Sequence, residues 1–242
     1  MPEYKYGNTI IEYTLEHKPD VKDIIISVDW IDGVNVVTPP SIDDKKLQEV
    51  LQKKSPWILS KWYEFEEITV PPKRKEFVSG EKFLYIGRFY RLKVEKTNME
   101  IVPSLVFKQN RFHVTVSSEL KNDELPAQLK PLFMNWYLQY GQAKLNERLR
   151  IYSPKMGVSP GKLQLKDQKM RWGSCAADKS IYINWRIMMA PMKIIDYVLV
   201  HEMVHLKYPN HSAEFWQYVR SILPDYDERK EWLRINGPTL TL

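Results

Sequence analysis

The 242-residue sequence contains only one cysteine, Cys175. A single thiol excludes an intramolecular disulfide and a Cys-rich zinc module, so any bound metal must rely on His and carboxylate ligands. Long apolar runs are also absent, and none approaches the ~20 apolar residues that a membrane-crossing helix needs. The N-terminus lacks the basic start, apolar middle and cleavage site of a secretory signal. We therefore expect a cytoplasmic protein that does not enter a membrane.

We recognise no low-complexity segment and no internal repeat in the sequence. The composition is instead that of a folded soluble protein, with 43% apolar and 27% charged residues. This length and composition suit one large domain or two small ones.

The first half of the chain is β-leaning, with short runs of β-branched and aromatic residues. We predict strands at 10–15, 24–28, 34–38, 83–86, 89–94, 105–107 and 112–116. The Asp and Gly residues of 29–33 suit a hairpin turn between the second and third of these. A helical insertion begins near residue 41, and Ser55-Pro56 has the form of a second helix start.

The second half predicts a compact core. Apolar residues recur at three- and four-residue steps from 123 to 150, which indicates a long helix. We predict short strands at 163–165 and 180–184, followed by helices at 191–206, 212–222 and 225–234. The fold class is therefore α+β: a β-leaning N-terminal region over residues 1–120, then a compact core over 121–242, either as two domains or as one continuous domain.

Positive charge is concentrated in the second half of the chain. Residues 1–120 carry 18 Lys+Arg and 18 Asp+Glu, whereas residues 121–242 carry 18 and 12. Eight of these cations lie between residues 144 and 171, where Glu147 and Asp167 are the only acidic residues: Lys144, Arg148, Arg150, Lys155, Lys162, Lys166, Lys169 and Arg171. This stretch is either a solvated face or a surface that contacts nucleic acid or an acidic protein substrate.

The sequence His201-Glu202-Met203-Val204-His205 carries the clearest chemical signal. Residues i and i+4 lie one turn apart on the same face of a helix, so both imidazoles can bind one ion with the glutamate beside them. This is an HExxH zinc motif, and random sequence of this composition would contain it with a probability of only about 0.8%.

A catalytic zinc site uses three protein ligands and keeps one position open for water. We predict His211 as the third ligand, because Pro209 ends the helical conformation at Tyr208 and Asn210 or Ser212 can cap the next helix. Glu214 is the alternative third ligand. The spacing of the histidines equals that of the metzincins, but Tyr208 replaces their glycine and no methionine follows Met203, so the downstream Met-turn is missing.

Together these residues resemble the YgjP-like metallopeptidases, which are relatives of the SprT-like and WLM zinc proteases. The resemblance is strongest over residues 163–237 and rests on the segments 169–175, 183–186, 189–191, 195–198, 201–205, 210–212 and 215–216. It implies a small zincin-like core with one Zn²⁺ per chain on His201, His205 and His211, Glu202 as catalytic acid/base, and peptidase activity. SprT-like relatives attack proteins that are crosslinked to DNA.

Zinc chemistry suggests how such a site would act. The ion lowers the pKa of a bound water from ~15.7 towards ~7 and polarises the substrate carbonyl. Glu202 would take the water proton and pass it to the leaving amine. Tyr208 or Tyr226 could stabilise the oxyanion, and Asp196 or Glu214 could accept the second N–H of a ligand histidine.

Zincin substrates lie extended along an edge strand, and we expect residues 181–184 to form that strand. Arg171, Trp172, Asn184 and Tyr208 are our candidates for substrate contact, with a structural role as the alternative for the first three. Two other functions share the same residues: a nucleic-acid-associated zinc protein that uses the stretch 144–171, and a zinc hydrolase of a non-peptide amide.

Overall fold

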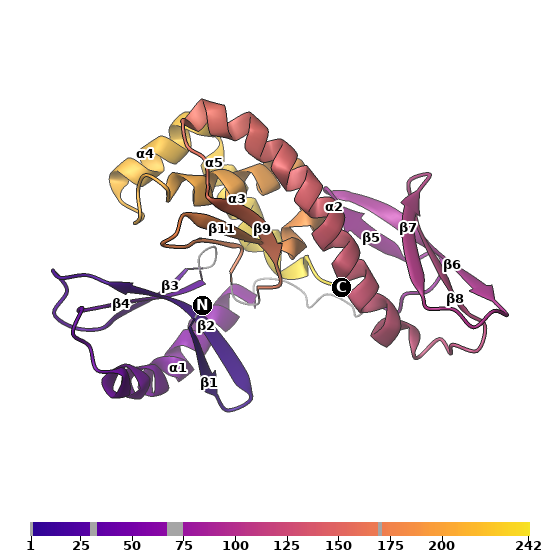
Figure 1. Cartoon of the computed structure of the whole chain (residues 1–242), viewed down its shortest axis with the longest axis horizontal. Helices are drawn as coiled ribbons and strands as arrows, with labels where there is room; N and C mark the ends of the chain where they lie inside the picture. Colours follow the sequence, from indigo (N-terminus) through magenta and orange to yellow (C-terminus); the bar gives the residue numbers. More distant parts are fainter. Residues whose placement is uncertain (1, 30–32, 67–74, 169–170) are drawn as a thin grey trace.

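The structure is a computed structural model that describes residues 2–29, 33–66, 75–168 and 171–242. Within these residues it confirms the α+β fold, with three small sheets and five α-helices (Figure 1). No helix in the described part of the chain is long and apolar enough to cross a membrane. The central residues 30–32 of the hairpin turn predicted at 29–33 lie outside the described residues, but the strands on either side of the turn pair antiparallel as expected.

The N-terminal sheet and the first helix form what we call the first unit. Its elements are β1 (Glu3–Tyr6), β2 (Thr9–His17), β3 (Ile25–Asp29), β4 (Gly33–Thr38) and α1 (Asp44–Glu66). The strand order is β1-β2-β4-β3, with β2 and β4 parallel at the centre. One face of the sheet packs on α1, because alternate residues such as Ile11, Tyr13 and Val34 are buried with Leu51 and Ile58 of the helix.

Helix α1 is continuous, so the predicted second helix start at Ser55-Pro56 is wrong. Pro56 lies inside the helix, and its solvent-exposed ring removes one backbone hydrogen bond without ending the helix. The fully buried Ser55 hydroxyl donates to the carbonyl of Leu51 at 2.7 Å. Burial of one helix face against the sheet therefore outweighs the local signal for a break.

The next four strands and the long second helix form the second unit. Its elements are β5 (Lys82–Tyr85), β6 (Arg88–Thr97), β7 (Ser104–Lys108), β8 (Arg111–Ser117) and α2 (Leu125–Met156). The order β5-β6-β8-β7, with β6 and β8 parallel at the centre, is the topology of the first unit. Phe83, Phe112 and Phe133 pack in one aromatic cluster between the sheet and α2.

The two units also agree in register. Tyr6 pairs with Thr9 in the first unit, and Tyr85 pairs with Arg88 in the second, an offset of 79 residues. The central pairs are Tyr13 with Val34 and Leu92 with Phe112, offsets of 79 and 78. The chain therefore contains an internal structural repeat, and our expectation of no repeat is wrong.

The remaining elements form what we call the C-terminal core. They are β9 (Lys162–Lys166), β10 (Gly173–Cys175), β11 (Ser180–Asn184), the 3₁₀ turn η1 (Trp185–Met189), α3 (Met192–Val204), α4 (Ala213–Ile222), α5 (Tyr226–Asn236) and the 3₁₀ turn η2 (Gly237–Thr239). The sheet order is β10-β11-β9. The expectation that residues 181–184 form an edge strand is wrong, because β11 is central: it pairs antiparallel with β10 and parallel with β9.

The second unit and the C-terminal core share one hydrophobic cluster, whereas the first unit has a cluster of its own. The shared cluster runs from Phe77 to Leu240, so the packing continues across residue 120. The first cluster holds residues from Ile11 to Ile58. Figure 1 shows α2 extending from the second sheet across the core, while the first unit lies beneath β9 and β11.

The turn between β5 and β6 fastens the second unit to the core. The backbone N–H groups of Ile86 and Gly87 donate to the carbonyls of Met188 and Met189, at 2.8 and 3.1 Å. Gly87 has φ +72°, and a Cβ there would lie 2.8 Å from Cα of Pro191. Only glycine combines this backbone conformation with such a close approach.

Candidate metal centre

Three histidines converge at the end of α3. His201, His205 and His211 each offer a ring nitrogen, and these atoms lie within 4.8 Å of one another. Nε2 of His201 and Nε2 of His211 face each other at 3.0 Å. His201 is buried, His205 is half-buried and His211 is exposed, so the cluster is open to solvent on one side. It could hold an ion.

The local sequence explains how the third histidine reaches the other two. Helix α3 ends at Val204, and the chain turns before α4 begins at Ala213. Ser212 caps α4: its side-chain oxygen accepts a hydrogen bond from the backbone N–H of Phe215 at 3.4 Å, as the sequence predicted for Ser212 or Asn210. His211 immediately precedes this cap and therefore faces back towards α3.

Helix α4 also supplies the packing that fixes the imidazoles. The fully buried ring of Phe215 lies 5.0, 4.6 and 4.7 Å from the rings of His201, His205 and His211. Trp216 stacks on His211 at 5.5 Å and 20°. The exposed histidine is therefore oriented by two aromatic contacts, a detail that the motif spacing did not reveal.

His205 has a backbone acceptor for its second ring nitrogen. Nδ1 of His205 lies 3.1 Å from the carbonyl oxygen of Tyr208, so in the tautomer with hydrogen on Nδ1 the ring donates there and leaves Nε2 for a ligand. The sequence interpretation offered Asp196 or Glu214 for such a role. Asp196 instead accepts two hydrogen bonds from Arg148, at 2.6 and 2.8 Å, and this pair joins α3 to α2.

The Arg148–Asp196 pair is bidentate and largely buried, with side-chain exposures of 19% and 7%. Hydrogen bonding to Asp196 raises the pKa of the Arg148 guanidinium above its ordinary value. Glu214 is exposed in the first turn of α4, and a hydrogen bond with Ser212 lowers the pKa of its carboxyl. Among the described residues, the group that could share an ion consists of the three histidines and does not include Glu214.

Glu202 is fully buried, and it lies directly against the edge strand β10. A Cβ added to Gly173 would fall 2.2 Å from Oε1 of Glu202 and 2.6 Å from its carboxyl carbon. The carboxylate therefore occupies the space that a side chain at residue 173 would need. Strand β10, rather than β11, is the strand edge beside Glu202.

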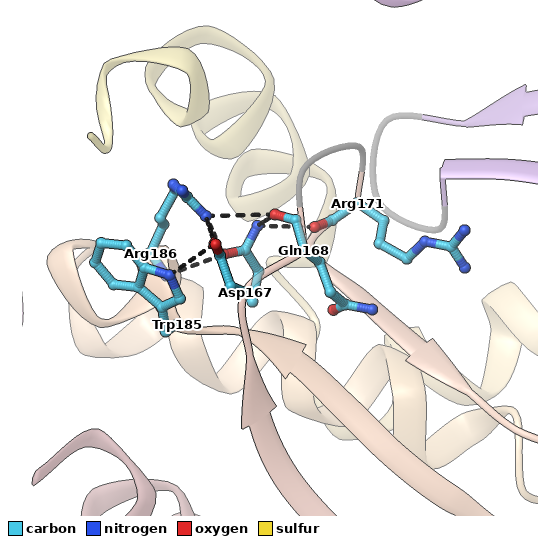
Figure 2. A network of polar contacts seen from close by, with 6 residues as sticks. Asp167, Gln168, Arg171, Trp185 and Arg186 are labelled. Atoms are coloured by element: carbon cyan, nitrogen blue, oxygen red, sulfur yellow. Dashed lines mark hydrogen bonds and ion pairs between the residues drawn. The ribbon is translucent and has the colours of Figure 1, made fainter. Parts of the chain in front are cut away.

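A polar network joins the residues that follow β9 to the end of β11 and the start of η1 (Figure 2). Asn184 donates to the carbonyls of Gln168 and Arg171, at 2.7 and 3.0 Å, and its own oxygen accepts from the backbone of Arg186. Asp167 accepts from the indole of Trp185 at 3.0 Å and pairs with Arg186. Asn184 is only 4% exposed, and these bonds use both its donor and acceptor groups, which favours the structural role.

Arg171 connects the core with the first unit. It is 1% exposed, and its Nη1 donates to the hydroxyl of Thr14 in β2 at 2.8 Å. Figure 2 shows its side chain pointing away from the polar network. Trp172 packs against η2, since a Cβ at Gly237 would lie 3.0 Å from its ring. Both contacts favour a structural role, and substrate contact by either residue stays a prediction.

The two tyrosines that were candidate oxyanion donors have different surroundings. The ring of Tyr208 packs against that of Tyr218 at 5.8 Å, and its carbonyl serves His205. Tyr226 is 6% exposed, stacks on Trp216 at 5.5 Å, and accepts a hydrogen bond from Arg220 at 3.2 Å. Neither interaction tests a role in catalysis, so the substrate contact predicted for Tyr208 also stays a prediction.

Three imidazoles whose nitrogens lie within 4.8 Å of one another, with a buried glutamate next to one of them in sequence, are typical of a metal-dependent enzyme. A family model described as "YgjP-like, metallopeptidase domain" matches residues 22–236. The chain therefore belongs to the YgjP-like metallopeptidase family, as the sequence resemblance indicated.

Comparison with individual proteins adds little. A search of curated proteins finds no match. Among solved structures, the chain is similar to the metallopeptidase zymogen of Pyrococcus abyssi abylysin, with 22% identity over 38% of this chain and 92% of that chain. The TM-score is 0.35, so this likeness supports no argument about the fold or the site.

Proposed function

We propose that the protein is a zinc-dependent peptidase of the HExxH type, with His201, His205 and His211 as ligands and Glu202 as general acid/base. The convergence of the three ring nitrogens within 4.8 Å, beside the buried Glu202, carries this proposal. Family membership supports a metallopeptidase. The identity of the metal, the role of Glu202 and the kind of substrate go beyond family membership, and they are what we propose here.

The donor set fits zinc. Three imidazoles with one side open to solvent match a catalytic zinc site, whereas Ca²⁺ and Mg²⁺ prefer oxygen ligands. Two nitrogens at about 2.05 Å from a tetrahedral ion lie about 3.3 Å apart, and the 3.0 Å between Nε2 of His201 and Nε2 of His211 is close to this value. The Tyr208 carbonyl can accept the second ring N–H of His205, and zinc-bound histidines usually have such an acceptor.

When bound, zinc would supply Lewis acidity, which lowers the pKa of a water and polarises the scissile carbonyl. Glu202 would take the proton from the attacking water and deliver it to the leaving amine. Gly173 leaves room for the carboxylate, and the packing of β10 against it holds the carboxylate in place. Phe215 and Trp216 hold the imidazoles, which limits the reorganisation needed during the reaction.

The edge strand β10 is the surface for an extended peptide. Its inner neighbour is β11, and within the described part of the chain no strand pairs with its outer edge, so a substrate strand could pair there. Because Gly173 in this strand touches the Glu202 carboxylate, a peptide paired there would pass the catalytic glutamate. This arrangement replaces our earlier assignment of the substrate edge to residues 181–184.

The test measures bound zinc and cleavage of a denatured protein substrate by wild type, Glu202→Gln, His205→Ala and His113→Ala. We expect Glu202→Gln to keep stoichiometric zinc but to lose activity by at least about a thousandfold, because general acid–base catalysis contributes this much. His205→Ala should lose both zinc and activity. His113→Ala is the matched control, since His113 lies in β8, and should keep both.

Activity retained by Glu202→Gln would contradict the proposed mechanism, and zinc retained by His205→Ala would contradict the ligand set. A hydrolase of a non-peptide amide would use the same ligands and the same glutamate. A panel of small amides in the same assay separates it from the peptidase: cleavage of these, with none of any protein or peptide, would favour that alternative.

A further inference from the structure

The second unit presents a row of four cations on the face of its sheet that points away from α2. Phe83, Leu92 and Phe112 are buried towards α2, so their neighbours in the strands point to the opposite, open face. Strand pairing places one basic residue from each of the four strands side by side: Lys82 with Arg91, Arg91 with Arg111, and Arg111 with Lys108. We call these four residues the basic row.

All four side chains of the basic row are exposed, and none forms an ion pair with another described residue. Neighbouring strands are about 4.8 Å apart, so the row extends about 14 Å across the sheet. Like charges that face each other across strands destabilise a sheet. Folding alone therefore gives no reason for this arrangement, but an anionic partner would.

The residues around the basic row add apolar contact surface. Phe89 is 65% exposed and Val106 is 50% exposed. His113 lies on the same face, paired with Lys93 and Val106. Burial, followed by the nearby charge of Lys108, lowers the pKa of His113, so its ring is neutral at pH 7. The open face thus combines unpaired cations with an exposed aromatic ring.

The equivalent face of the sheet in the first unit has the opposite charge. At the positions of Lys82 and Arg91 it has Glu3 and Glu12, which pair with each other in the same register. Thr14, on the same face as Glu12, accepts the hydrogen bond from the buried Arg171. In the first unit, this face of the sheet therefore accepts a hydrogen bond from a cationic side chain. In the second unit, the equivalent face is basic, and its charge is suited to an anion.

We propose that the open face of the second unit binds single-stranded nucleic acid, with phosphates on Lys82, Arg91, Lys108 and Arg111 and a base stacked on Phe89. A cationic track next to an aromatic platform is the arrangement by which proteins bind single strands. An acidic polypeptide would use the cations, but unlike a nucleotide chain it does not carry a ring beside each charge. The bases of a duplex are already stacked on one another.

This location differs from the basic stretch 144–171 that the sequence suggested. Arg148 pairs with Asp196, and Arg171 is buried against Thr14, so two of those cations are used within the fold. Arg150, Lys155 and Lys162 are exposed. They provide a direct comparison between the two surfaces.

The experiment uses the full chain and fluorescence anisotropy with a labelled single-stranded DNA of about 20 nucleotides, at salt concentrations from about 50 to 200 mM. The test variant is Arg91→Gln/Lys108→Gln/Arg111→Gln. Two triple variants with the same loss of charge serve as comparisons: Arg150→Gln/Lys155→Gln/Lys162→Gln, and Lys45→Gln/Lys46→Gln/Lys53→Gln on α1. Thermal unfolding of each variant checks that it is folded.

For single strands, each phosphate contact contributes about 0.7 to the slope of log K against log salt. We therefore expect the test variant to flatten this slope by about 2 and to weaken binding about 100-fold near 0.1 M salt. Phe89→Ser should weaken binding about tenfold and leave the slope unchanged, because base stacking is not ionic. Both comparison variants should bind within a few-fold of wild type.

Five results would overturn the proposal. Four of them are an equal loss in the α1 variant, a larger loss in the 150–162 variant, tighter binding of a duplex of the same sequence, and tighter binding of polyglutamate. A test variant that binds as well as wild type would do the same. None of these outcomes depends on peptidase activity, so this test is independent of the proposed function.

Discussion

The first and second units have the same strand order, pairing directions and register, but they differ in packing and in charge. The second unit shares its hydrophobic cluster with the C-terminal core, whereas the first unit has a separate cluster. The segment 3–38 has three Lys+Arg and seven Asp+Glu, a net charge of −4, and the segment 82–117 has seven and two, a net charge of +5. Topology decides which residues share a face, and the side chains there decide what the face binds.

These opposite charges nearly cancel in the composition of residues 1–120, which is why the first half of the chain looks neutral. Its net charge of zero combines one acidic unit and one basic unit that have the same topology. Net charge is therefore informative here only when it is counted for each structural unit.

Removal of the proposed zinc ion should distinguish the two units most strongly. A ligand that binds only the folded state stabilises by about 4 kcal/mol at a thousand times its Kd, so chelation should destabilise the core and the second unit by this amount. The first unit should be unaffected, because its hydrophobic cluster is separate. Hydrogen exchange with and without chelator measures this, and faster exchange over residues 3–38 as well would show that the two clusters unfold as one.

The turn glycines should show the second largest contrast. Gly87→Ala combines a left-handed residue with a clash against Pro191, and we expect a loss of about 3 kcal/mol. Gly7→Ala should cost about 1 kcal/mol, since Gly7 also has positive φ but nothing lies within 4 Å of an added Cβ. Urea unfolding measures the loss of stability in both variants. Equal losses would contradict the role of the β5–β6 turn in joining the second unit to the core.

A smaller contrast is expected at Thr14 and Lys93, which occupy equivalent positions 79 residues apart. Thr14→Val removes an acceptor from the buried Arg171 and should cost about 1–2 kcal/mol. Lys93→Val breaks an exposed ion pair with Glu95 and should leave the stability nearly unchanged. Denaturant titration distinguishes them, and a larger effect at Lys93 would reverse the assignment of the buried contact to the first unit.

The smallest effect concerns one carboxyl group. A hydrogen bond from Lys93 holds the pKa of Glu95 below its ordinary value of 4.5, so the pair contributes above that pH and is lost as pH falls through the lowered pKa. Lys93→Gln should therefore raise the pKa of Glu95 towards its ordinary value, as followed by NMR titration. An unchanged pKa would assign the shift to another group.

Local patterns predicted much of the fold and of the geometry of the candidate metal centre. The i, i+4 spacing of His201 and His205 and the Ser212 cap depend on neighbouring residues, and the structure agrees with both. The carbonyl of Tyr208 could not be found in this way, because every residue has a carbonyl and only the turn brings this one to His205.

Long-range pairing limited the prediction of the rest. The position of β11 depends on its parallel pairing with β9, which precedes it by some 18 residues, and hydrophobic pattern does not identify such a partner. The repeat was missed because equivalent positions differ in chemistry: Glu12 corresponds to Arg91, and Thr14 to Lys93. These residues share only their position in the strand pairing, and that position becomes visible only in the folded sheet.

The stacking of Trp216 between His211 and Tyr226 has a spectroscopic consequence. The indole lies 5.5 Å from each ring, nearly parallel to both, with the ammonium group of Lys230 4.6 Å from it. The emission of an indole responds to the charge and electron demand of a ring stacked on it. Trp216 is therefore an intrinsic optical reporter on one of the three histidines, and its fluorescence can follow occupancy of the metal centre without any added label.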